Sequence, residues 1–246
     1  MKVYKFGGAS VKDARGVRNI ASLIQAEKGE LLVVISAIGK TTNALEVVAE
    51  THRGIMEDLA LSDYGRIYDA FVSQGELNST RIVSEYLNAN GITNTWLDAR
   101  QIMVTDAIHR AANVDFENTC ERLKAAMIAS PSRVYIIQGY IGATKTGEVT
   151  TLGREGSDYS AAVFGAAVQA ESVTLWKDVP GVLTADPRRD EKATLIPEMT
   201  YQEAIQLTAT GAQIIHPKTI KPLAERHIPL YVRPFNSPKE DGTVIR

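Results

Sequence analysis

The chain has 246 residues, enough for one α/β domain with a buried core, and its 44% hydrophobic and 23% charged residues are ordinary for a globular protein. The formal net charge of −2 argues against a nucleic-acid-binding surface, and the single cysteine, Cys120, excludes a disulfide framework and a cysteine zinc cluster. The apolar runs are too short to span a bilayer, and residues 1–10 read as a strand and a turn rather than a cleavable signal. We therefore expect a cytoplasmic protein without a nucleic-acid or membrane partner.

Apolar runs typical of strands alternate with helical patterns along the chain. We predict strands at residues 2–6, 31–36, 93–97, 133–138, 172–177 and 229–233. We predict helices at residues 13–28, 42–53, 64–89, 115–129, 157–169, 200–210 and 217–226. The candidate N-caps are Asp13, Thr41, Asp115 and Thr200, and the glycines that stand where helices are expected to stop are Gly29, Gly54, Gly91 and Gly211.

This order of elements predicts the fold class. The run Leu31–Ile35 lacks polar alternation, as expected for a strand that helices cover on both faces. Repetition of strand and helix favours a three-layer αβα sandwich around a mainly parallel sheet. We predict a single domain over residues 1–246 with two lobes, one to about residue 168 and one from about residue 169.

The first strand carries Lys5 and ends at Gly7-Gly8. Two adjacent glycines let the backbone turn without a Cβ in the way, so several N–H groups can point at one anion. A lysine at the end of the strand adds a point charge beside these donors. The segment therefore has the outline of a phosphate cradle.

A second segment, Gly39-Lys40-Thr41, follows a predicted strand in the manner of a P-loop. That motif also needs a glycine five residues before Gly39, and position 34 is Val34, inside the strand. The P-loop interpretation is therefore excluded.

Residues 150–162 combine a glycine-rich turn, Arg154, and Ser157-Asp158 at the start of an alanine-rich helix. This arrangement is typical of an anion site, in which a bidentate donor stands next to a helix N-terminus. The alternative is that Ser157 or Asp158 only caps the helix and that Arg154 is solvated.

Together, these motifs resemble the aspartokinases, within the larger amino-acid kinase family. The matching segments are Lys-Phe-Gly-Gly-Ala-Ser at residues 5–10, Ser36 with Thr42-Asn43, Gln-Gly-Glu at 74–76, Thr-Leu-Gly-Arg-x-Gly-Ser-Asp-Tyr at 151–159, and residues 176–188 and 211–219. The resemblance covers essentially the whole chain. It implies an amino-acid kinase fold and ATP-dependent phosphorylation of the L-aspartate β-carboxylate to 4-phospho-L-aspartate, the first step toward lysine, threonine and methionine.

The resemblance also implies residue roles. Lys5 and Asp158 would be catalytic, Lys5 by stabilising the transferring phosphoryl group and Asp158 by orienting Lys5. Arg154 would bind the α-carboxylate of aspartate and Glu76 its ammonium group. The other implied substrate contacts are Ser36, Thr42, Gly156 and Ser157. The implied nucleotide contacts are Lys5, Gly7, Gly8, Lys177, Asp178, Leu183, Arg188 and Gln213.

ATP is the implied nucleotide, with Mg²⁺ held mainly through its phosphates. No metal site made by the protein is expected, because His52, His109, His216 and His227 stand at scattered spacings. A homodimer is compatible with the resemblance. Family members commonly continue into regulatory ACT domains, and this sequence stops where the catalytic domain would end. We therefore expect no ACT domains and no inhibition by lysine or threonine.

Four positions depart from the family pattern. Relatives commonly have Gly at Glu155, Thr at Lys177, Tyr at Leu183 and Lys at Gln213, and we expect Glu155 to face solvent. The changes at Lys177, Leu183 and Gln213 leave open a non-catalytic nucleotide-binding module of the same fold. Another amino-acid kinase (glutamate 5-kinase, acetylglutamate kinase or uridylate kinase) is the second alternative. The Gln-Gly-Glu and Arg-x-Gly-Ser-Asp-Tyr segments favour aspartate over these.

Overall fold

The computed structural model describes residues 1–185, 190, 192–209 and 215–246. The strands are β1 (Lys2–Phe6), β2 (Leu31–Ile35), β3 (Thr95–Leu97), β4 (Val104–Thr105), β5 (Val134–Gln138), β6 (Ile141–Thr144), β7 (Val149–Thr151), β8 (Ser172–Lys177), β9 (Glu198–Met199), β10 (Leu230–Pro234) and β11 (Thr243–Ile245). The helices are α1 (Ala14–Ala26), α2 (Thr41–Asp58), α3 (Tyr64–Ala89), α4 (Ala99–Ile102), α5 (Phe116–Ala129), α6 (Gly156–Ala167), α7 (Tyr201–Ala209) and α8 (Pro217–Ala224).

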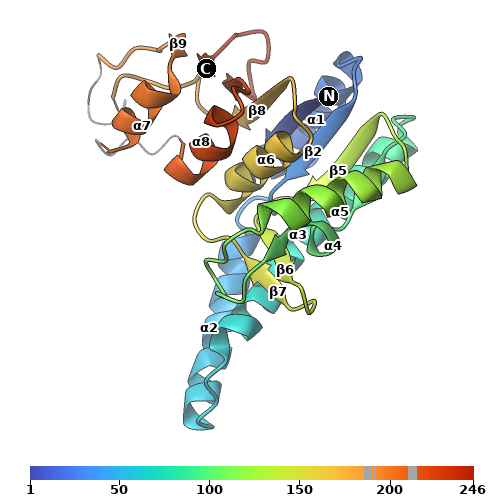
Figure 1. Ribbon diagram of the computed structural model, residues 1–246, viewed down its shortest axis with the longest axis vertical. Coiled ribbons are helices and arrows are strands. Elements are labelled where there is room, and N and C mark those ends of the chain that lie inside the picture. Colours follow the sequence, from blue (N-terminus) through green and yellow to red (C-terminus); the bar gives the residue numbers. More distant parts are fainter. Residues whose placement is uncertain (186–189, 191, 210–214) are drawn as a thin grey trace.

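One continuous sheet organises the molecule (Figure 1). Its strand order is β3-β5-β2-β1-β8-β10-β11-β9, and all neighbours are parallel except β10 and β11. The prediction of a mainly parallel central sheet is confirmed. Because β1, β2, β5 and β8 run in the same direction, their carboxyl ends meet at one edge of the sheet, where ligand sites of open α/β sheets form.

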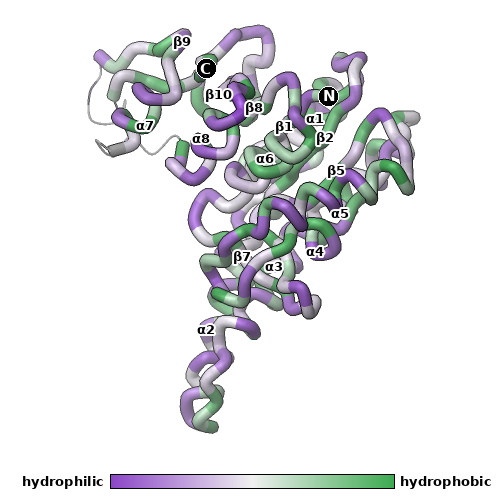
Figure 2. Tube along the Cα trace, in the orientation of Figure 1, coloured by the Kyte–Doolittle hydropathy of each residue, from purple (hydrophilic) through white to green (hydrophobic). Residues whose placement is uncertain are grey.

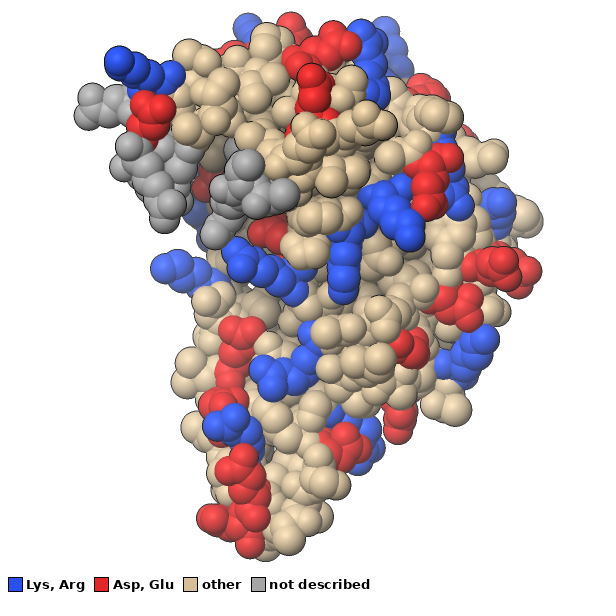
Figure 3. Space-filling model, turned by 60° about the vertical axis from the view of Figure 1, so that its left-hand side comes forward, with Lys and Arg blue, Asp and Glu red and all other residues tan. Residues whose placement is uncertain are grey.

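Hydrophobic residues concentrate in the central strands and in α6, whereas the projecting α2 is largely polar (Figure 2). This helix forms an arm with α3 that extends away from the sheet (Figure 1). On the face drawn in Figure 3, Lys and Arg side chains gather along a hollow between the arm and the opposite end of the molecule.

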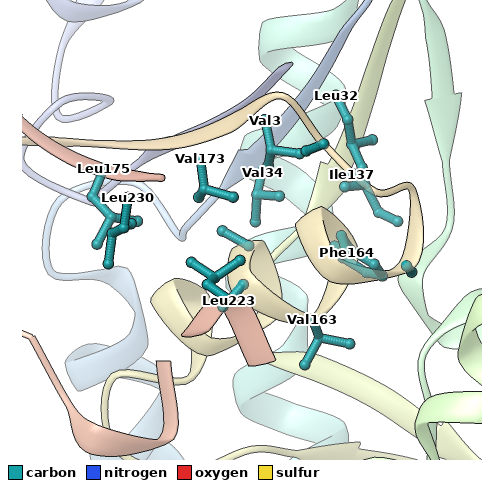
Figure 4. Packing of buried hydrophobic residues seen from close by; sticks show 14 of the residues in the cluster. Val3, Leu32, Val34, Ile137, Val163, Phe164, Val173, Leu175, Leu223 and Leu230 are labelled. Carbon is teal, nitrogen blue, oxygen red and sulfur yellow. The ribbon is translucent and has the colours of Figure 1, made fainter. Parts of the chain in front are cut away.

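Strand β2 explains how the layers form, because its side chains alternate between two cores. Leu32 and Val34 pack with Phe164 of α6 and Leu223 of α8 (Figure 4). Leu31, Val33 and Ile35 pack on the other face, against α1 and α3. The predicted strand covered by helices on both faces is therefore confirmed, and the fold is a three-layer αβα sandwich.

A second sheet, in the order β4-β6-β7, was not predicted. Its strands are only two to four residues long, so their side chains do not establish a period. The antiparallel β6–β7 pair leads directly into the turn before α6. The small sheet therefore places residues 153–158 beside the edge of the main sheet. The short elements β9, β11 and α4 were missed for the same reason.

The predicted N-caps hold at three helices. Asp13 and Asp115 accept backbone hydrogen bonds from Gly16 and Asn118, respectively. Thr200 forms a capping box with Glu203. The Thr200 hydroxyl accepts a hydrogen bond from the Glu203 backbone N–H, and the Glu203 carboxylate accepts one from the Thr200 backbone N–H. The prediction for Thr41 is wrong, because α2 begins at this residue and its hydroxyl donates to the Ile38 carbonyl instead.

The predicted helix stops are borne out in part. Gly91, at φ +77°, follows the end of α3, and Gly29 lies three residues beyond the last residue of α1. Gly211 lies outside the described residues. The prediction for Gly54 is wrong, since α2 continues through it to Asp58 and the space around Gly54 is open.

A glycine, Gly75, stands in the middle of α3. Helix α3 continues through Gly75 without a break. A Cβ at this position would lie 2.9 Å from the Cβ of Ala37, in the loop after β2. The glycine therefore serves close packing of α3 against that loop rather than a break in the helix.

Replacing Gly75 with Ala should destabilise the protein by about 1–2 kcal/mol, because overpacking outweighs the gain in helix propensity. The matched control is Gly54→Ala in α2, which places the new methyl group in open space and should stabilise the protein by about 0.5–1 kcal/mol. Urea denaturation of both variants measures the difference. Equal effects of the two substitutions would contradict the packing role of Gly75.

Candidate active site

A cleft of about 710 Å³ opens at the carboxyl ends of β1, β2 and β5. Segments far apart in the sequence form its walls: the turns after these strands, the first half of α2, the middle of α3 and the start of α6. All the predicted catalytic and substrate-binding residues line this one cleft: Lys5, Ser36, Thr42, Glu76, Arg154, Gly156, Ser157 and Asp158. The structure thus brings together residues that the sequence analysis connected only through a resemblance.

The centre of the site is a buried carboxylate between two lysines. Asp158 stands in the first turn of α6 and is fully buried. Its Oδ1 lies 2.6 Å from the Nζ atom of Lys5 on β1, and its Oδ2 lies 2.8 Å from the Nζ atom of Lys177 at the end of β8. Burial alone would raise the pKa of Asp158, but the two ammonium groups outweigh it and hold this pKa well below its usual range. The carboxylate therefore remains ionised and is not suited to act as a general base.

The neighbouring carboxylate, Glu76, has the opposite environment. It is only 2% exposed, and its Oε1 accepts one hydrogen bond, 3.3 Å long, from the Ala37 backbone N–H. Burial raises the pKa of Glu76 to about 7, although the Ala37 N–H, the Thr42 hydroxyl and the charge of Lys5 favour ionisation. A buried carboxylate with so little compensation is suited to bind a cationic group.

The glycine pair after β1 has a packing role. A Cβ on Gly8 would lie 2.6 Å from the carbonyl oxygen of Gly39, and the Gly39 N–H donates to the Gly8 carbonyl. The loops after β1 and β2 therefore touch through their backbones, and only glycine allows this approach. Gly8 lines the cleft, whereas Gly7 does not. Binding of phosphate by these glycines remains a prediction.

The turn before α6 carries Arg154 and Glu155 at the mouth of the cleft. Both are exposed, and Glu155 adopts a left-handed conformation with φ +55°. Glu155 is therefore open to solvent, as expected, but its carboxylate does not point away from the site. Its Oε2 lies 3.8 Å from the Nζ atom of Lys177. An acidic group thus stands beside the pair of lysines.

The predicted nucleotide contacts are dispersed. Lys5 and Gly8 line the cleft, and Lys177 reaches Asp158 at its wall. Asp178 is exposed after β8, and Leu183 is buried in a β-bridge with Leu195; neither lines the cleft. Arg188 and Gln213 lie outside the described residues.

The sequence analysis missed a buried anchor, Asp69 on α3. Its carboxylate accepts hydrogen bonds from the Thr151 hydroxyl (2.6 Å) and from the Arg110 backbone N–H (3.1 and 3.2 Å), and His109 Nδ1 lies 2.8 Å away. Asp69 therefore joins α3 to the end of β7 and to the loop before α5. Its place between the apolar positions 68 and 72 of the helix was the only sequence signal, and an aspartate there is ordinarily read as solvated.

The anchored loop contributes a further cleft residue, Arg110. Its guanidinium lies over the ring of Tyr68, 4.5 Å from the centroid, and both residues line the cleft. The Tyr68 hydroxyl donates to Glu46 of α2, 2.5 Å away. Tyr140, after β5, also lines the cleft and was not predicted. These residues form the end of the cleft next to the α2–α3 arm.

Within the described ranges, no three His, Cys, Asp or Glu side chains come together in a group that could hold a metal ion. Likewise, none of the helices in the described part of the chain is long and apolar enough to cross a membrane.

Comparison with known proteins identifies the family of the chain. Residues 1–234 match the model of the amino acid kinase family. The chain belongs to this family. Lysine-sensitive aspartokinase 3 of Escherichia coli (strain K12) is 30% identical over 99% of the chain and 63% of the relative. Aspartokinase 1, chloroplastic, of Arabidopsis thaliana is 34% identical over 99% of the chain and 51% of the relative.

Solved structures extend the comparison. E. coli aspartokinase III in complex with aspartate and ADP superposes with a TM-score of 0.88 at 31% identity, over the whole chain and 64% of that structure. The chain thus spans about half to two thirds of these relatives. UMP kinase from Ureaplasma parvum, at 16% identity and a TM-score of 0.64, shares the fold alone.

Replacing Asp69 with Asn should destabilise the protein on the order of 3 kcal/mol, since Asn keeps the volume but loses the charge that the Arg110 N–H and the Thr151 hydroxyl contact. The control is Asp63→Asn at the exposed start of α3, where the ion pair with Arg66 is on the surface and the effect should stay below about 0.5 kcal/mol. Chemical denaturation measures both, and a small effect at Asp69 would contradict its anchoring role.

Proposed function

We propose that this chain is the catalytic domain of an aspartate kinase, which transfers the γ-phosphoryl group of ATP to the β-carboxylate of L-aspartate. The observation that carries the proposal is the polarity of one cleft. Lys5, which Asp158 holds together with Lys177, provides positive charge at one part of its wall, and the buried carboxylate of Glu76 provides negative charge at another. The overall similarity to E. coli aspartokinase III, which binds aspartate and ADP, supports the same function.

The reaction does not need a general base. The β-carboxylate of aspartate has a pKa near ~4 and is already ionised at neutral pH. The obstacle is electrostatic, because this anion must approach the polyanionic phosphates of ATP. Catalysis then depends on positive charge and on in-line placement of the two reactants. Lys5 stabilises the transferring phosphoryl group, and Asp158 fixes the position of its ammonium group.

Recognition of aspartate needs contacts to three charged groups. Glu76 binds the α-ammonium, which compensates the buried carboxylate, and Arg154 binds the α-carboxylate with two parallel hydrogen bonds. Ser36 and Thr42 fix the side-chain end next to Lys5. This set of contacts distinguishes an amino acid from a simple dicarboxylate, which lacks the ammonium group.

Mg²⁺ would enter with ATP and neutralise charge between its phosphates. Both oxygens of Asp158 are occupied by lysines, and the described residues offer no cluster of carboxylates around them. The ion is therefore held mainly through the phosphates in this proposal, and Lys5 and Lys177 provide the charge that comes from the protein.

Substituting Lys5 by Ala should lower turnover by several orders of magnitude (~10³-fold) while aspartate still binds, because the charge on the transferring group is lost. The control is Lys28→Ala, an exposed lysine beyond α1. The measurement is ADP release with ATP and aspartate, together with trapping of the acyl phosphate by hydroxylamine. Near-normal turnover would remove Lys5 from the mechanism, and activity with glutamate or UMP in place of aspartate would overturn the proposed substrate.

Glu76 predicts a pH dependence. Its pKa of about 7 in the folded protein means that it is protonated below pH 7 and cannot bind an ammonium group there. The KM for aspartate should therefore rise toward about tenfold per pH unit below 7, since aspartate itself does not titrate between pH 5.5 and 8. In the Glu76→Gln variant, KM should be high at every pH and the profile flat.

The same group affects stability. Between pH 4.5 and 7 the folded state binds more protons than the unfolded state, so stability falls as pH rises through this window. The loss amounts to roughly 3 kcal/mol and should be absent in Glu76→Gln. Urea denaturation at pH 5 and pH 8 tests this without substrate, and an equal pH dependence in both proteins would refute the raised pKa.

A further inference from the structure

The loop before α5 holds Arg110 by its backbone, which leaves the side chain available to a ligand. The Arg110 N–H donates to both oxygens of the buried Asp69 carboxylate, 3.1 and 3.2 Å away. The residue also has a left-handed backbone, with φ +68°. Such strained conformations concentrate at functional sites. Since any residue except proline supplies the N–H, the anchor does not explain an arginine at this position, and the reason for it lies with the side chain.

The guanidinium of Arg110 is oriented by aromatic rings. It lies 4.5 Å from the ring centroid of Tyr68 and 5.7 Å from that of Tyr64. Stacking uses the face of a guanidinium and leaves its N–H donors, which lie in the plane, for an acceptor at the edge. Within the described ranges, this guanidinium donates no hydrogen bond and forms no ion pair. The nearby Glu46 carboxylate instead accepts from the Tyr68 hydroxyl, 2.5 Å away.

Arg110 and Arg154 approach the cleft from the same wall. Asp69, which binds the Arg110 N–H, also accepts from the Thr151 hydroxyl at the end of β7. The chain then turns at Gly153, where a Cβ would lie 3.1 Å from the Arg110 carbonyl oxygen. The turn that carries Arg154 therefore packs directly on the backbone of Arg110, and both residues line the cleft.

Two guanidinium groups on one wall suit a carboxylate. Its two oxygens have about four lone-pair positions, so it can accept two parallel hydrogen bonds from one arginine and a further bond from a second. A polyphosphate is less suitable at this end of the cleft, because Glu46 also lines it and would repel a multiply charged group. The chemistry of the wall thus favours a ligand group with a single negative charge.

We propose that Arg110 is a specificity-determining residue, which binds the α-carboxylate of aspartate together with Arg154, and that Tyr68 positions its guanidinium. The proposal rests on the proposed kinase function and deepens it. It makes the α-carboxylate the most strongly recognised group at the arm end of the cleft, so the site should discriminate against amino acids in which this group is neutral.

The test is a series of ligand affinities for Arg110→Gln, measured by titration calorimetry without nucleotide at pH 8, where Glu76 is ionised. Aspartate should bind about tenfold more weakly than to the unaltered chain, because a hydrogen bond to a charged group is lost. The α-amide of L-aspartate keeps the ammonium and the β-carboxylate but has no α-carboxylate. Its affinity should change less than about threefold, since the interaction with Arg110 is already weakened.

Succinate provides the complementary probe, because it lacks only the ammonium group of aspartate. Arg110→Gln should weaken succinate by the same factor as aspartate, since both keep the carboxylate that Arg110 binds. Arg110→Lys keeps the charge but not the planar fork, and it should recover only part of the loss. The backbone N–H that binds Asp69 is present in both variants, so both should fold. If Arg110→Gln does not fold, Arg110→Lys provides the same comparison of aspartate with its α-amide.

The matched control is Arg53→Gln on α2. Arg53 is an exposed arginine of the arm that pairs with Glu50 at 3.1 Å and does not line the cleft. Its loss should leave the affinity for each of the three ligands unchanged.

Turnover separates this proposal from the proposed function. In Arg110→Gln, the KM for aspartate should rise about tenfold while kcat stays within about twofold, because the α-carboxylate does not react. Equal losses for aspartate and its α-amide would overturn the role of Arg110, and so would an unchanged affinity for aspartate. If the unaltered chain binds aspartate but does not phosphorylate it, only the proposed function fails; if it does not bind aspartate, both proposals fail.

Discussion

The buried carboxylate of Asp158 is the constraint on which the site depends. An uncompensated charge at this depth would be strongly unfavourable, so the fold must bring cations to it. The parallel pairing of β1 with β8 does this, because Lys5 pairs with Leu175 in register and Lys177 follows at the end of the same strand. Asp158 comes from the first turn of α6, where the helix dipole also favours its negative charge. The carboxylate of Asp158 thus joins α6 to β1 and β8 at the edge of the site.

The cleft contains a second buried carboxylate with opposite properties. Asp158 contacts two cations and keeps a low pKa, whereas Glu76 accepts few hydrogen bonds and has a pKa of about 7. Two carboxylates whose environments shift their pKa values in opposite directions commonly have different roles. In the proposed function, Asp158 remains an anion that positions Lys5, and Glu76 receives the cationic group of the substrate. The polarity of the cleft follows from these two environments.

Local patterns predicted the central strands and the alanine-rich helix, because β2 and residues 161–167 of α6 are buried and continuously apolar. Local patterns do not account for features that depend on a distant contact. Position 75 of α3 is a glycine because a Cβ there would lie 2.9 Å from the Cβ of Ala37, and no local rule contains that contact. The pairing of Lys177 with Asp158 likewise exists only once β8 lies next to β1. The resemblance located most of the cleft residues, but it did not indicate Asp69 or Arg110.

One helix connects both sides of the substrate part of the cleft. Helix α3 carries Glu76 into the cleft, and two turns earlier it carries Asp69, which binds the Thr151 hydroxyl at the end of β7. The chain then runs through Gly153, at φ +76° and close to the Arg110 carbonyl, to Arg154. The spacing between Glu76 and the turn that bears Arg154 is therefore fixed by the rise of a continuous helix and one buried hydrogen bond. A break in α3 at Gly75 would uncouple these two groups, so the helix must continue through this position although close packing against Ala37 requires a glycine there.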